Sequence, residues 1–118
     1  MAPKVLEKRI ILENANGYLA IEREPVGNVL VISPWNYPLL TTVNTLIPSI
    51  LAGNSVIIKH SPYTPFCGEV FQTAAEEAGV KGIIQNCMVD IAVCQHLLSH
   101  PQVDYVSFTG RYCILRLI

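Results

Sequence analysis

An asparagine stands between two aromatic residues in the segment Ser33-Pro-Trp-Asn-Tyr-Pro38, which directly follows the apolar run 28–32. A simple connection needs only proline or glycine. Two large rings on either side of an amide therefore predict a place where a ligand is held. The alternative is that Asn36 caps the helix that follows, which is a common position for asparagine.

Polar residues and a glycine also follow two later segments with strand-like patterns. The segment 59–61 ends the run 55–59, and the segment 109–110 follows the run 103–108. If these runs are parallel strands of one sheet, their carboxyl ends meet at the same edge, and open α/β sheets bind ligands beyond that edge. The segment 33–36 belongs there too. The spacing therefore predicts one binding edge built from all three segments.

Strand and helix patterns alternate along the chain at short spacing. The expected strands cover 18–23, 28–32, 55–59, 82–88 and 103–108, and the expected helices cover 38–51, 64–79 and 91–99. Pro48 should kink the first helix or restart it, and Thr64 followed by Pro65 should begin the second.

The order of these elements predicts an α/β fold. Alternating strands and helices favour a doubly wound, Rossmann-like parallel sheet with right-handed crossovers. The two earliest strands, joined by the turn 24–27, are expected to form an N-terminal β-hairpin.

Composition excludes several classes of protein. Apolar residues make up 51% of the 118 and charged residues 14%, which is typical of one core-rich α/β domain. The net charge is −1 without a basic run, so neither nucleic acid nor a membrane surface is an expected partner. No apolar run reaches the length of a membrane span, which predicts a soluble, cytoplasmic protein.

The cysteines do not indicate a metal site. Cys67, Cys87, Cys94 and Cys113 form no CxxC pair, and no histidine lies at metal-ligand spacing from them. Buried free thiols are expected, with no metal. His60, His96 and His100 receive no role.

Three motifs occur together in the order and at about the spacing of the aldehyde dehydrogenase superfamily. They are EPVGNVLVISPWNYP (24–38), LAGNSVIIKHSPYTP (51–65) and VDYVSFTG (103–110). The chain resembles the N-terminal, cofactor-binding portion of that superfamily over about residues 18–110. The resemblance implies oxidation of an aldehyde with NAD or NADP. In that chemistry a cysteine thiolate attacks the carbonyl, hydride passes to the nicotinamide, and a glutamate base releases the water that hydrolyses the thioester.

The resemblance also implies roles for five residues. Asn36 matches the asparagine that donates to the developing oxyanion, where an uncharged donor avoids pairing with the thiolate beforehand. Trp35 matches an aromatic residue beside the cofactor phosphates, Lys59 a donor to the adenosine ribose, and Gly110 the glycine that faces the pyrophosphate. Ser61 would contact the ribose or a 2′-phosphate. The alternatives are core packing for Trp35, a solvated strand exit for Lys59 and a solvated loop for Ser61.

The chain departs from the family pattern in two places. Pro62 replaces a carboxylate that many NAD-preferring members carry three residues after the lysine, so the preference between NAD and NADP stays open. After Gly110, bulky residues replace the serine and glycine of the phosphate loop. None of the four cysteines matches the nucleophile. The resemblance therefore places the catalytic cysteine, the catalytic glutamate and the later strands of the sheet beyond the end of this chain.

The expected organisation is an N-terminal extension with the first strand (1–24), a partial nucleotide-binding domain (25–110) and a divergent tail (111–118). One hypothesis is a fragment of an NAD(P)-dependent aldehyde dehydrogenase that is inactive alone. The other is a noncatalytic truncated product that associates with full-length subunits or has no function. The tail is then either a genuine terminus or a reading-frame artefact. The aldehyde and the oligomeric state are open.

Overall fold

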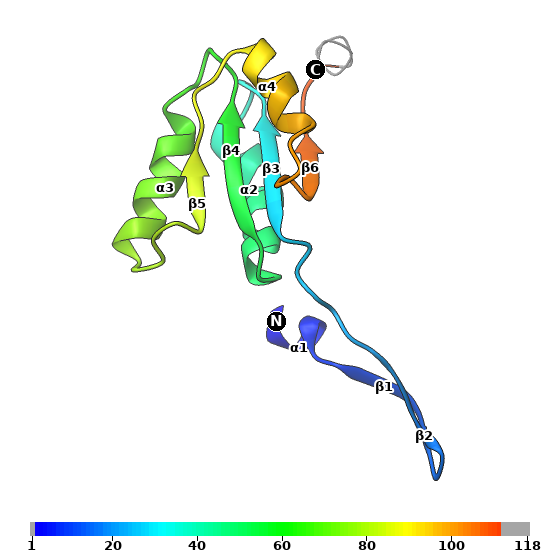
Figure 1. Ribbon diagram of the computed structural model, residues 1–118. Helices are drawn as coiled ribbons and strands as arrows, with labels where there is room; N and C mark the ends of the chain where they lie inside the picture. The colour runs from blue at the N-terminus through cyan, green and yellow to red at the C-terminus, as the bar shows by residue number, and fades with distance from the viewer. Residues whose placement is uncertain (1, 112–118) are drawn as a thin grey trace.

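The computed structural model describes residues 2–111, which form a four-stranded parallel sheet and a separate two-stranded hairpin (Figure 1). The sheet has the order β5-β4-β3-β6. Its strands are β3 (Asn28–Ser33), β4 (Ser55–His60), β5 (Ile84–Asn86) and β6 (Tyr105–Phe108). All three neighbouring pairs are parallel, which confirms the predicted α/β sheet, although β5 and β6 are shorter than expected.

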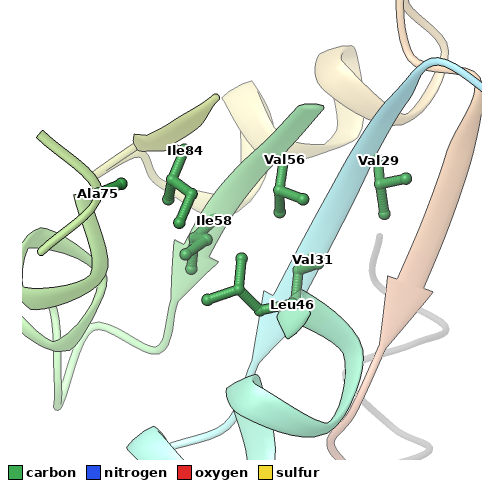
Figure 2. Close-up of a cluster of buried hydrophobic side chains, with 7 residues drawn as sticks. All are labelled: Val29, Val31, Leu46, Val56, Ile58, Ala75 and Ile84. Carbon is green, nitrogen blue, oxygen red and sulfur yellow. The ribbon is translucent and has the colours of Figure 1, made fainter. Parts of the chain in front are cut away.

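Helices cover both faces of the sheet, as a doubly wound fold requires. On one face, α2 (Pro38–Leu51) and α3 (Cys67–Glu77) enclose a buried cluster with the strands. Figure 2 shows Leu46 of α2 directed at Val31 and Ile58 of the sheet. On the other face, α4 (Ile91–Leu98) packs Cys94 against Leu30 and Ile32. The apolar run 28–32 is therefore buried on both sides.

Two helices differ from their sequence-based predictions. Helix α2 runs through Pro48 as one element, so the helix does not restart there, and the kink, which was the other expected outcome, stays a prediction. Helix α3 begins at Cys67 rather than after Thr64, because the preceding residues form tight turns instead. In those turns the Thr64 N–H donates to Ser61 O at 2.9 Å and the Cys67 N–H donates to Thr64 O at 3.3 Å.

The N-terminal hairpin is present, but its first strand was not predicted. Strand β1 (Arg9–Asn14) pairs antiparallel with β2 (Gly17–Ile21), whereas 28–33 joins the parallel sheet instead of the hairpin. A short helix, α1 (Ala2–Leu6), precedes it. The hairpin extends away from the sheet, and the described chain measures 59 × 34 × 24 Å along its principal axes (Figure 1). None of the helices in residues 2–111 is long and apolar enough to cross a membrane.

Candidate functional site

The carboxyl edge of the sheet brings the three predicted segments together. The four strands in Figure 1 point toward this same edge. Beyond the strand ends, the Ser61 N–H donates to Ser33 O and the Thr109 N–H donates to Ile32 O, both at 3.0 Å. Since β3 lies between β4 and β6, the segment 34–36 leaves the sheet with Ser61 on one side and Gly110 on the other.

Asn36 is exposed at this edge and its side chain makes no hydrogen bond within residues 2–111. Only its backbone carbonyl is engaged, accepting from Thr41 Oγ1 at 3.3 Å. The N-cap of α2 is Tyr37, in the left-handed conformation and without a side-chain cap. The capping alternative for Asn36 is therefore not observed, and its amide is uncommitted.

Trp35 is 60% exposed and lies outside both core clusters. The core-packing alternative is therefore wrong for this residue. Its ring belongs to the surface of the segment that carries Asn36, where it is accessible to a ligand.

Lys59 is only 7% exposed, so most of its side chain is buried instead of extending into solvent at the strand exit. Its ammonium makes no hydrogen bond or ion pair with any residue in the described part of the chain. Burial raises the pKa of the Cys94 thiol, and the positive charge of Lys59 partly opposes that rise. The stem of Lys59 is buried, but its unpartnered Nζ is not among the fully buried polar atoms of the described residues, so the ammonium reaches the surface of the edge. There it is available to an acceptor supplied by a ligand.

A buried polar cluster, not predicted from the sequence, lies at the same edge on the opposite face. Thr42 Oγ1 is 2.7 Å from Ser33 Oγ and 3.3 Å from His60 Nε2. All three residues are at most 5% exposed. Burial, and secondarily the Lys59 charge, lower the pKa of His60, which favours neutral imidazole. Strand alternation was the sequence signal that could have predicted this cluster. Ser33 lies two residues after Val31, and His60 two residues after Ile58, so these four side chains point to the same face of the sheet.

Ser61 and Gly110 have less defined surroundings. Ser61 Oγ accepts from the Tyr63 N–H at 3.4 Å and is partly exposed. A side chain at Gly110 would place its Cβ 2.7 Å from Phe108 Cζ, so glycine allows the strand end to turn over that ring. Residues 112–118, including Cys113 and the predicted tail after Arg111, lie outside the described residues.

The other chemistry-bearing residues remain separate. Cys67, Cys87 and Cys94 are free thiols, and Cys94 is buried. Within residues 2–111 no group of three or more His, Cys, Asp or Glu side chains is arranged to hold a metal ion. The edge offers one uncommitted amide, one unpartnered ammonium on a buried stem, and an exposed aromatic ring. This donor set suits a ligand with hydroxyl and carbonyl oxygens.

Comparison with known proteins identifies the protein family of this chain. The aldehyde dehydrogenase family model matches residues 1–118. The geranial dehydrogenase of Castellaniella defragrans is 39% identical over 99 residues, covering 83% of this chain and 21% of that enzyme. The NADP(+) succinate-semialdehyde dehydrogenase of Deinococcus radiodurans is 36% identical over 109 residues, covering 92% of this chain and 23% of that enzyme.

The structural comparison agrees. The NAD-dependent benzaldehyde dehydrogenase from Corynebacterium glutamicum superposes with a TM-score of 0.87 and 32% identity, covering 98% of this chain and 27% of that one. The chain spans about a fifth to a quarter of the length of the curated relatives it matches. The match over the whole sequence, with relatives above 30% identity, confirms the resemblance, and the chain belongs to the aldehyde dehydrogenase family.

Proposed function

We propose that this chain forms the part of an NAD(P)-dependent aldehyde dehydrogenase that holds the cofactor and supplies an oxyanion donor. The observation that carries the proposal is the placement of the 34–36 segment, with its uncommitted Asn36 amide, between Ser61 and Gly110. Relatives named for NAD and for NADP both support a nicotinamide cofactor. Residues 25–110 are the proposed partial nucleotide-binding domain, between the extension 1–24 and the tail 111–118, in a cytoplasmic protein.

In this proposal two side chains act on opposite ends of the reaction site. The Lys59 ammonium donates to ribose hydroxyls, which supply the hydrogen-bond partners that the described chain does not. Asn36 donates to the aldehyde oxygen as negative charge develops on it, and an uncharged donor stabilises that charge without pairing with the thiolate beforehand. The nicotinamide supplies the hydride acceptor when bound. Trp35 shields the cofactor phosphates from one side.

The discrimination between NAD and NADP falls to Ser61 and Pro62. Pro62 carries no charge, so a 2′-phosphate meets no repulsion from this position, and the Ser61 hydroxyl is partly exposed beside it. Both cofactors are therefore compatible with this edge.

The proposal is tested by exchanging the corresponding segment of a full-length family member for residues 24–110. We expect the chimera to form NADH or NADPH from an aldehyde, and Lys59→Met to raise the KM for the cofactor more than it lowers kcat. A folded chimera that neither binds nor reduces either cofactor would refute the proposal.

We also propose that the 118-residue chain is inactive by itself. None of its cysteines matches the family nucleophile, and no residue matches the base that hydrolyses the thioester. The measurement is NADH or NADPH formation by the purified chain with aliphatic and aromatic aldehydes. Turnover that disappears when one of its own four cysteines is replaced would overturn this expectation.

A second candidate function is noncatalytic association with full-length subunits. The observation that favours it is strand β6, which ends the sheet and has no partner on its outer side within the described chain. Co-purification with a full-length family member tests association, and sequencing the transcript across codon 110 shows whether the family's glycine-rich continuation lies in another frame or exon.

A further inference from the structure

The Thr42 hydroxyl lies at the centre of the buried cluster behind the binding edge. Thr42 is fully buried, and its oxygen has three polar neighbours. They are Ser33 Oγ at 2.7 Å, Pro38 O at 2.7 Å and His60 Nε2 at 3.3 Å.

The proton positions in this cluster follow from what each atom can donate. A hydroxyl has one proton and two lone pairs, and a carbonyl oxygen can only accept. The Thr42 hydroxyl is oriented to donate both to Pro38 O and to Ser33 Oγ, each at 2.7 Å, so its single proton is shared between two acceptors. Its remaining lone pair can accept from the Nε2–H of a neutral His60. The Nε2–H tautomer of His60 is therefore the one that fits this cluster.

These contacts connect the two segments that the proposed function uses. Ser33 is the last residue of β3, before the 34–36 segment, and Pro38 is the first residue of α2 after it. His60 lies between Lys59 and Ser61 in sequence and is the register partner of Ser33. One hydroxyl thus contacts both ends of the segment that carries Asn36 and the strand end that carries Lys59.

We infer that Thr42 is a positioning residue, whose hydroxyl fixes the segment 34–37 relative to the end of β4. The role of Asn36 in this statement rests on the proposed function. The positioning itself does not, because it concerns contacts within the chain and needs neither cofactor nor aldehyde to be measured.

The chain provides its own reporter for this experiment. Trp35 is its only tryptophan, lies in the positioned segment and is 60% exposed. Its quenching by acrylamide therefore reports on the exposure of that segment, and its time-resolved fluorescence anisotropy separates local motion of the segment from tumbling of the whole chain. Far-UV circular dichroism confirms that each variant is folded, and urea unfolding gives its overall stability.

Three variants of α2 separate positioning from simple stability. Thr42→Val removes the hydroxyl at nearly constant volume, and Thr42→Ser keeps the hydroxyl while removing the methyl group. Thr45→Val is the matched control, because Thr45 Oγ1 bonds Ser107 Oγ at 3.2 Å one turn further along the same helix, away from the segment. All three are measured in the full 118-residue chain under native conditions.

We expect Thr42→Val to lower the anisotropy of Trp35 and to increase its quenching, whereas Thr42→Ser and Thr45→Val keep the native values. Equal signals in Thr42→Val and the unsubstituted chain would overturn the inference, as would equal changes in Thr42→Val and Thr45→Val. If Thr42→Val does not fold, Ser33→Ala is judged by the same criterion. Failure of both to fold also counts against it, because the cluster would then support the whole fold rather than one segment.

If the segment exchange described under the proposed function fails while the Trp35 signals change as expected, the positioning stands and the proposed chemistry does not. If the chimera is active while the Trp35 signals of Thr42→Val are unchanged, the proposed chemistry stands and the positioning role of Thr42 does not.

Discussion

Tyr37 has a φ of 46°, and it is the only non-glycine residue with positive φ in the described chain. The left-handed conformation costs an L-residue about 1–2 kcal/mol, and its ring, 71% exposed, gains little from packing. Such local strain persists where surrounding contacts fix it and is common at functional sites. Here it lies directly after Asn36 and turns the chain into α2, which leaves the Asn36 amide free of helix-capping contacts.

Asn36→Ala, made in a chimera that contains residues 24–110, should lower kcat by about 10²–10³-fold, the usual effect of removing one oxyanion donor. Stability should change little, because the side chain makes no described contact. Asn44→Ala, the same change at an exposed position of α2 within the exchanged segment, is the control and should leave kcat unchanged. An unchanged kcat for Asn36→Ala, under conditions where acylation limits the rate, would remove Asn36 from the proposed catalytic group.

His60 should make stability depend on pH. Its pKa is lowered from the ordinary value of 6.5, first by burial and then by the charge of Lys59. The unfolded chain therefore binds this proton at higher pH than the folded chain, and the free energy of unfolding should decrease as pH falls below about 6.5. His60→Gln should remove this part of the slope. His96→Gln, at an exposed position, should retain this part of the slope. The measurement is urea unfolding between about pH 7.5 and 5, roughly the range in which histidine titrates.

At the scale of elements, the start of β3 depends on a close approach to β6. Gly27 has a φ of +120°, and a Cβ there would meet the carboxylate of Asp104. That carboxylate accepts from the Asn28 N–H at 2.7 Å, while the Asn28 side chain donates to Gln102 O at 2.9 Å. These contacts fix where the two strands begin their pairing.

Gly27→Ala should therefore reduce the free energy of unfolding by about 1–3 kcal/mol, by strain at positive φ and by displacing Asp104. Gly82→Ala is the comparison, because its φ is +86° and no atom lies within 4 Å of the added Cβ. Urea denaturation of both variants measures the difference. Equal losses would show that backbone strain alone accounts for the effect and that the approach of Asp104 is unimportant.

The sequence predicted those elements whose signals are local. The run 29–32 is apolar at every position because both faces of β3 are covered. Helix α4 ends close to the residue at which the sequence pattern ends. Strand β1 was missed because Ile10, Ile11 and Leu12 do not alternate, and its register shifts between Ile10 and Leu12. The Asn16-Gly17 pair was the available turn signal. The start of α3 was misplaced because turn hydrogen bonds at Ser61 and Thr64 replaced the expected cap.

For the candidate site, the sequence predicted which residues lie at the carboxyl edge of the sheet but not the buried contacts behind them. Strand ends can be located from the sequence, so Asn36, Lys59 and Gly110 could be assigned to one edge from the sequence alone. The burial of Lys59 could not be predicted, because it depends on α4 packing over the same face. The contacts of Thr42 with Ser33 and His60 join residues up to 18 positions apart and required the packing of α2 to be known.

For the molecule as a whole, the outer edge of β6 is the expected site of self-association. Tyr105 is 56% exposed on a strand whose outer hydrogen-bonding groups have no neighbouring strand in the described chain. Charged side chains on edge strands oppose strand-to-strand association. Tyr105→Lys should therefore reduce the high-mass fraction of the purified chain.

The control for this prediction is Tyr63→Lys, which makes the same chemical change at an 86% exposed loop position away from any strand edge. Both variants are compared by light scattering coupled to size-exclusion chromatography. Similar behaviour of the two variants would attribute association to general surface hydrophobicity or to the exposed hairpin instead of the β6 edge.

The sheet order also has a consequence for synthesis on the ribosome. Strand β3 ends at Ser33, but its neighbour β6 begins only at Tyr105. At about 5–20 residues per second, the ribosome needs about 4 to 14 seconds to produce the intervening chain. During that time one side of the most apolar strand has no native partner and is open to pairing with other nascent chains. The speed of translation between codons 34 and 104 therefore sets how long a chaperone must protect the centre of the sheet.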